Sequence, residues 1–114
     1  MSPRDAATAT VTQARSVFSA LGDETRLSLV ARLSSGGPQS ISQLTSRSRV
    51  TRQAVTKHLD VLAGAGVVHD TRRGRERIWE LDSTRLLDAS RALDQISRRW
   101  DEALDRLKIF VERD

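Results

Sequence analysis

The sequence predicts a mainly α-helical domain with one small β-hairpin, and three observations lead to this prediction. Apolar residues recur at three- and four-residue spacing over most of the 114 residues, as on amphipathic helices. Residues 67–71 and 76–81 are typical of two strands, the second with alternating polar and apolar residues, on either side of an arginine-rich turn. From residue 84 onward an apolar seven-residue repeat marks one long helix. The predicted order is α-α-α-α-β-β-α, in a single domain (residues 11–114) that follows a flexible N-terminal stretch (residues 1–10).

The first two helices are predicted by spacing and by capping residues. Residues 11–21 carry apolar side chains at helical spacing, and Gly22 ends this first helix. Asp23 can cap the second helix by accepting hydrogen bonds from its free N–H groups. Residues 34–38, SSGGP, then form the strongest turn signal in the chain. Within the second helix we expect these side chains to face inward: Leu27, Val30, Ala31 and Leu33.

Two shorter helices follow, with a polar connection at residues 47–50. Ser40 and Gln43 have the spacing of a capping box and predict a third helix around residues 41–46. Thr51 can cap a fourth helix over residues 52–63, with Val50 and Val55 at the two positions of a hydrophobic staple. Both helices carry an apolar stripe, so we expect them to pack as a helix-turn-helix.

A β-hairpin and a long final helix complete the prediction. Residues 67–71 and 76–81 predict two strands, and Gly74 between them can adopt the positive φ of a tight turn. Asp82 or Ser83 caps the final helix, about residues 84–112. Its heptad repeat predicts a dimer interface shared in part with the first helix, although the same stripe could pack on that helix within one chain. The expected interface residues are Val17, Phe18, Leu86, Leu93, Ile96, Trp100, Leu107 and Phe110.

One segment carries the excess positive charge. Between Arg47 and Arg77 eight basic residues stand against three acidic ones, so this segment has a net charge of +5 and the remainder has −1. A helix-turn-helix followed directly by a hairpin is a winged helix-turn-helix, which places its second helix in the major groove of DNA. The hairpin, or wing, then lies along the backbone or minor groove. The charge and the element order together predict binding to double-stranded DNA.

The residue types on the fourth helix agree with groove recognition. With its apolar side chains turned inward, the helical step of 100° puts Arg52, Gln53, Thr56, Lys57 and Asp60 on the outer face. Arginine can bond guanine and glutamine adenine in the major groove, whereas Thr51 and Lys57 suit phosphates. The expected DNA-binding residues are Thr51, Arg52, Gln53, Thr56, Lys57, His58, Arg72, Arg73, Arg75 and Arg77.

These residues predict a homodimeric, sequence-specific DNA-binding protein on an imperfect palindrome whose half-sites lie about one duplex turn apart. An alternative is a winged-helix interaction module whose basic wing binds an acidic protein or another anionic partner. That module would bind DNA weakly and without sequence preference.

Four segments of the chain resemble the ArsR-type winged-helix repressors: residues 18–27, 51–59, 62–68 and 73–81. The resemblance covers residues 17 to about 112 and implies a homodimer built on the first and last helices. It also implies DNA recognition by residues 51–58, wing contacts from residues 72–77 and repression of a nearby promoter. Metal-sensing members carry Cys pairs in the third helix or His, Asp and Glu sets in the last. This chain has no Cys and its last helix has no His, so it is similar to the branch without cysteine metal sites.

Other functional classes lack the residues they need. The absence of Cys excludes disulfides and thiolate metal sites, and no nucleophile–base or metal-ligand set can be assembled, so we expect no enzyme, no metal and no cofactor. His58 is expected to pack or to reach DNA at the helix edge, and His69 to lie on a strand surface. With no apolar run of membrane-spanning length and no apolar signal core, we expect a cytoplasmic protein with no membrane association. A small-molecule inducer of unknown identity stays open.

Overall fold

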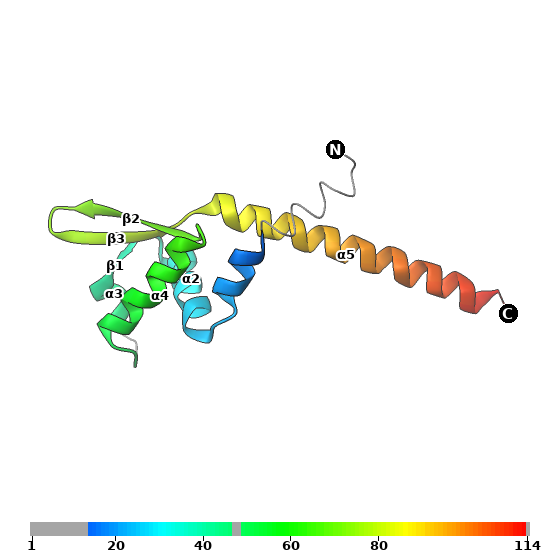
Figure 1. Cartoon of the computed structure of the whole chain (residues 1–114), viewed down its shortest axis with the longest axis horizontal. Coiled ribbons are helices and arrows are strands. Elements are labelled where there is room, and N and C mark those ends of the chain that lie inside the picture. The colour runs from blue at the N-terminus through cyan, green and yellow to red at the C-terminus, as the bar shows by residue number, and fades with distance from the viewer. Residues whose placement is uncertain (1–13, 47–48, 114) are drawn as a thin grey trace.

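The computed structural model describes residues 14–46 and 49–113, and its elements follow the predicted order with one addition (Figure 1). The predicted flexible stretch, the start of the first helix and Arg47 lie outside the described residues. Residues 14–21 are helical. They are followed by α2 (Glu24–Gly36), β1 (Gln39–Ser40), α3 (Ile41–Thr45), α4 (Arg52–Gly64), β2 (Val68–Arg73), β3 (Glu76–Leu81) and α5 (Ser83–Glu112).

The capping residues read from the sequence are confirmed. The Asp23 carboxylate accepts from the Arg26 N–H at 2.9 Å and starts α2. Ser40 and Gln43 form a reciprocal capping box on α3, with both backbone N–H groups satisfied. Asp82, the first of the two predicted caps, begins α5 by accepting from the Thr84 N–H. Gly74 has φ +63° in the tight turn of the hairpin.

The sheet contains a strand that the sequence did not predict. β1 is only two residues long and pairs antiparallel with β3, with Gln39 opposite Trp79 and Ser40 opposite Ile78, so the strand order is β1-β3-β2. Two residues cannot show alternation, and their partner strand lies about 40 positions away, so no local signal marks β1. The pairing attaches the hairpin to the start of α3 and thereby fixes the wing to the helix-turn-helix (Figure 1).

A single apolar core joins most of these elements. Its fully buried side chains include Leu44 of α3, Val55, Leu59 and Leu62 of α4, and Trp79 of β3. In α2 the expectation was partly wrong, because Leu29 and Leu33 are buried whereas Leu27 is 52% exposed and Ala31 is exposed. Leu27 lies two residues from Leu29, a rotation of about 200°, so the two side chains cannot share one face of the helix.

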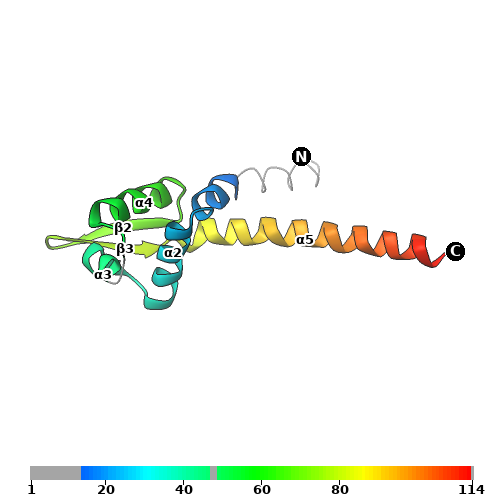
Figure 2. The same cartoon turned by 90° about the horizontal axis from the view of Figure 1, so that it is seen from below.

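α5 belongs to the core only at its beginning. Ala89 and Ala92 are buried in the same cluster as Ala14 and Val17 of the first helix. Beyond them α5 extends away from the domain, at the opposite end of the molecule from the wing, and the described chain is 68 Å long (Figures 1 and 2). Within the described residues, packing on the first helix of the same chain therefore covers only the start of the apolar stripe.

Candidate nucleic-acid interface

α4 presents a polar outer face because its apolar face is completely buried. Val55, Leu59 and Leu62 have no exposed surface, and they hold the helix against the core. The opposite face carries the exposed side chains of Arg52, Gln53, Lys57 and Asp60, as the helical spacing predicted. Three of these four can donate hydrogen bonds, and two are cationic. The outer face therefore suits a hydrogen-bonding and negatively charged partner.

Two threonine hydroxyls are already engaged with the helix backbone. The Thr51 Oγ1 atom accepts from the Ala54 N–H at 3.1 Å, which makes Thr51 the N-cap of α4. The Thr56 hydroxyl donates to the Arg52 carbonyl oxygen at 2.9 Å. The Thr51 hydroxyl can therefore still donate a hydrogen bond to a ligand, whereas the Thr56 hydroxyl already donates within the helix.

The pleat of the wing separates arginines that are neighbours in sequence. Arg72 lies directly opposite Arg77, and Arg73 directly opposite Glu76. Directly paired residues share a face of the sheet, so Arg72 and Arg77 lie on the face that also carries buried Trp79. Arg73 lies on the other face, and Arg75 lies in the turn between the strands. The four arginines therefore do not form one uniform cluster.

Arg77 is held by its neighbours on the wing. Its Nε atom donates to the Asp70 Oδ2 atom at 2.8 Å, and its guanidinium carbon lies 4.7 Å from the centre of the Trp79 ring. The hydrogen bond from Arg77 lowers the pKa of Asp70 below its ordinary value of 3.8. Arg77 also faces Arg72 across the hairpin, and the Asp70 carboxylate offsets the repulsion between the two like charges.

A hollow of about 250 Å³ lies between the start of α4, the start of α3 and the wing. Arg52 and Thr56 of α4 form one side, and Arg75 and Arg77 of the wing form another. The remaining lining residues are Ser40, Ile41, Ser42, Glu76 and Trp79. Because one hollow is bounded by both, the first turns of α4 and the tip of the wing border the same opening on the surface.

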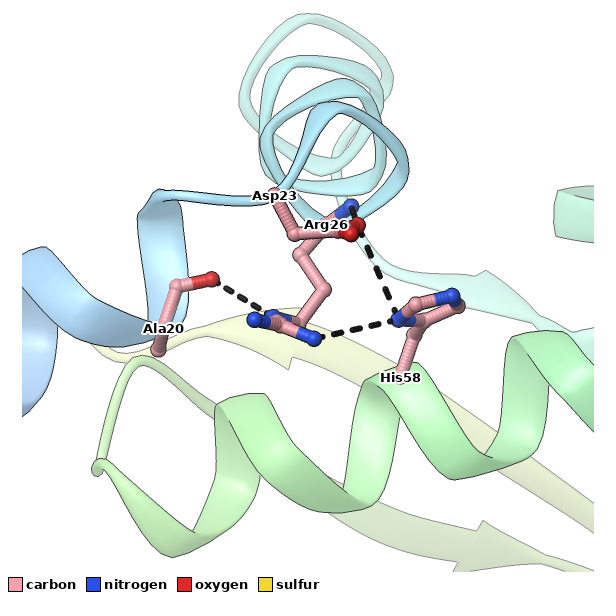
Figure 3. A network of polar contacts seen from close by, with 4 residues as sticks. All are labelled: Ala20, Asp23, Arg26 and His58. Atoms are coloured by element: carbon pink, nitrogen blue, oxygen red, sulfur yellow. Dashed lines mark hydrogen bonds and ion pairs between the residues drawn. The ribbon is translucent and has the colours of Figure 1, made fainter.

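His58 points toward α2 (Figure 3). Its Nδ1 atom lies 3.4 Å from the Arg26 Nη1 atom and 3.8 Å from the Asp23 Oδ2 atom. The Arg26 Nε atom also donates to the Ala20 carbonyl oxygen at 2.7 Å. The hydrogen bond from the Arg26 backbone N–H is the main cause that lowers the pKa of Asp23. Of the two roles that the sequence left open for His58, this geometry favours packing.

Arg32 is a structural residue that the sequence reasoning missed. Its guanidinium donates to the carbonyl oxygens of Leu44 and Gln43, the latter at 2.8 Å, and thereby fixes the end of α3 to α2. Both carbonyl groups belong to the last turn of α3, and the Gln43 oxygen also accepts from the Ser46 hydroxyl at 2.9 Å. The available signal was a lone cation between the apolar positions Leu29 and Leu33.

The residues predicted for a dimer interface divide into two groups. Val17 is buried within its own chain, and Phe18 and Leu86 pack partly against the same core. The other five, Leu93, Ile96, Trp100, Leu107 and Phe110, are exposed along α5, with Trp100 at 64% and Phe110 at 73%. A contiguous apolar stripe of this length is unusual on the surface of a monomer.

No three His, Asp or Glu side chains within residues 14–46 and 49–113 come close enough to hold a metal ion. In the same part of the chain no helix is both long and apolar enough to cross a bilayer.

Comparison with known proteins gives consistent matches. Residues 21–71 match the model of a family described as a helix-turn-helix domain. The HTH-type transcriptional regulator Rv2034 of Mycobacterium tuberculosis is 39% identical over 87 residues, which cover 76% of this chain and 78% of that protein. The transcriptional repressor SdpR of Bacillus subtilis is 29% identical over 73 residues, 64% of this chain and 80% of SdpR.

A solved structure supports the same assignment. The ArsR-like transcriptional regulator from Rhodococcus sp. RHA1 superposes with a TM-score of 0.77 and 36% identity, over 90% of this chain and 95% of that one. The matched proteins are transcriptional regulators rather than enzymes. The chain belongs to the ArsR family of winged helix-turn-helix transcriptional regulators, and its lack of cysteine agrees with the branch that has no thiolate metal site.

Proposed function

We propose that this regulator is a homodimeric repressor that binds an imperfect palindrome in double-stranded DNA. α4 enters the major groove, where Gln53 reads a base edge and Lys57 contacts the backbone. The wing, residues 72–77, follows the backbone or the minor groove. Because the relatives in Mycobacterium tuberculosis and Bacillus subtilis are bacterial, and a bacterial chromosome lies in the cytoplasm, the protein acts there.

The observation that carries the proposal is the common orientation of two cationic elements. Arg52 and Thr56 of α4 line the same hollow as Arg75 and Arg77 of the wing. A duplex that meets one element therefore also meets the other, as a winged helix-turn-helix requires. The name of the relative SdpR supports repression as the regulatory outcome.

The exposed stripe on α5 supports a dimer. Leu93, Trp100 and Phe110 are each more than half exposed in one chain, and full burial of a large apolar side chain stabilises an assembly by roughly 1.5–3 kcal/mol. A two-fold axis through this stripe presents α4 twice, and a twofold-symmetric protein recognises a palindromic site.

The test measures binding to the DNA immediately upstream of the protein's own coding region by fluorescence anisotropy. A salt series and a random-sequence competitor duplex accompany it. We expect the upstream duplex to resist the competitor, and its affinity to fall steeply with salt as phosphate contacts release counterions. Equal affinity for both duplexes, together with tight capture of an acidic protein, would instead support an interaction module with an anionic protein partner. A reporter under the same promoter distinguishes repression from activation.

A further inference from the structure

The hollow between α4 and the wing contains more positive charge than its neighbours neutralise. Arg52, Arg75 and Arg77 line it, against the single carboxylate of Glu76. Within the described residues Arg52 and Arg75 make no ion pair. Arg77 donates to the Asp70 carboxylate through its Nε atom only. The terminal nitrogens of three guanidinium groups are therefore available around one concave surface.

The walls of the hollow add preorganisation. Arg77 is fixed between the Asp70 carboxylate and the Trp79 ring, so little of its side-chain freedom remains to be lost when a ligand binds. The Ser42 hydroxyl lies on the α3 side and adds a neutral donor. Fixed guanidinium groups with hydroxyl donors are the groups that bind phosphate oxygens in proteins.

We infer that this hollow is a phosphate-binding site, which takes one phosphate group from the DNA backbone or from a small free anion. The first source rests on the proposed function. When α4 lies in the major groove and the wing in the adjacent minor groove, the strand that separates the two grooves passes between them. The hollow lies in that position. Arg52 then binds the DNA backbone and contributes affinity for any sequence. This role differs from the reading of guanine that its position on the outer face of α4 suggested.

The first experiment titrates the free protein with sodium phosphate and follows backbone amides by two-dimensional NMR, with sodium chloride at equal ionic strength as the reference. We expect saturable shifts at Ser42, Thr56 and Arg75. The Arg52→Ala variant should abolish them, and Arg73→Ala should retain them. Arg73 is the matched control because it lies on the same wing but on the opposite face of the ribbon, outside the hollow.

The second experiment replaces single phosphates of the bound duplex by neutral methylphosphonates. We expect one position in each half-site at which the replacement weakens binding by the wild type. At that position it should not weaken binding by the Arg52→Ala variant any further. The slope of log affinity against log salt should fall in magnitude by about 0.9 for Arg52→Ala, because one phosphate contact is lost. Arg73→Ala should still respond to the replacement at that position.

The outcomes separate the site from the proposed function. A coupled methylphosphonate position identifies the backbone as the ligand, and saturable phosphate shifts without such a position identify a free anion. If the amide shifts do not saturate, and no methylphosphonate position distinguishes the wild type from Arg52→Ala, the phosphate site is overturned even if the protein binds its operator. Failure to prefer any duplex overturns the proposed function, while the NMR titration still decides whether the hollow binds phosphate.

Discussion

Arg26 of α2 and His58 of α4 lie in contact, with 3.4 Å between the Nη1 and Nδ1 atoms (Figure 3). Arg26 also donates to the Ala20 carbonyl oxygen at the end of the first helix. A single guanidinium thus connects the first helix, which packs with α5, to the helix that we propose reads DNA. Arg26 therefore links the first helix to α4 through its contacts with Ala20 and His58.

Arg26→Ala should therefore lower the free energy of unfolding by about 1.5–3 kcal/mol, the range for hydrogen bonds that involve a charged group. The measurement is urea unfolding followed by circular dichroism at a fixed protomer concentration, because the stability of a dimer depends on concentration. Arg91→Ala is the matched control. Arg91 forms an exposed ion pair of 3.9 Å with Asp88, and such pairs contribute about 0–1 kcal/mol. Equal effects of the two variants would contradict the bridging role of Arg26.

Acid should weaken the fold through Asp23. Hydrogen bonding in the folded state lowers the pKa of Asp23 below its ordinary value of 3.8. A carboxyl group with a lowered folded pKa stabilises the protein above its ordinary pKa, and this stabilisation is lost as the pH falls from about 3.8 through the folded value. Asp23→Asn removes the charge but keeps a good N-cap residue.

The difference in unfolding free energy between the wild type and Asp23→Asn should therefore be constant near neutral pH and shrink below about pH 4. Urea titrations from pH 7 to pH 3 measure it. A difference that does not change over this range would show that the charge of Asp23 contributes nothing to folding. Asp70, whose pKa is also lowered, stays unchanged in both proteins and so cancels from the comparison.

Arg32→Ala should also destabilise the protein, by about 1–3 kcal/mol, because two carbonyl oxygens at the end of α3 lose their charged donor. Arg32→Lys should recover only part of this loss, since an ammonium group does not reproduce the planar fork of a guanidinium. Urea midpoints of the three proteins give the comparison. Full recovery by lysine would show that charge alone, rather than the paired hydrogen bonds, fixes α3.

The helices, their caps and the hairpin turn could be predicted because each depends on residues close together in sequence. Asp23, Ser40 and Thr51 cap the helices that follow them, and Gly74 provides the only positive φ in the hairpin. β1 could not be predicted, since it exists only through pairing with β3. The prediction that Leu27 faces inward was wrong, because the sequence of α2 offers more than one apolar face. Only packing against the rest of the core determines which face is buried.

The candidate site divides in the same way. Helical spacing alone was sufficient to place Arg52, Gln53 and Lys57 on the outer face of α4. The division of the wing arginines depends on the strand register, which pairs Arg72 with Arg77 and Arg73 with Glu76. The hollow depends on tertiary contacts among three elements, so no sequence pattern could indicate it.

Gln53 should determine base preference if α4 enters the major groove. Gln53→Ala removes a side chain that can bond adenine through two hydrogen bonds, and each such pair discriminates against the wrong base by about 1–3 kcal/mol. Binding to a set of operators with single base-pair changes should show the preference lost at one position per half-site. Lys57→Ala is the control, because loss of a backbone contact weakens binding to all of these operators alike. Unchanged base preference in Gln53→Ala would place another residue in the groove.

Leu93→Asp should dissociate the dimer, because it places a charge in the middle of the apolar stripe on α5. Leu93 is 54% exposed in a single chain, so the substitution removes little from the core of the protomer. Arg98→Asp introduces the same carboxylate about 140° around the helix, outside the stripe, and should leave the dimer intact. Sedimentation velocity of both variants measures the assembly, and circular dichroism confirms that each is folded. If Leu93→Asp remains dimeric, the interface lies elsewhere. If it becomes a folded monomer, it should also lose the preference for a palindrome over an isolated half-site, because that preference requires two copies of α4 held in one assembly.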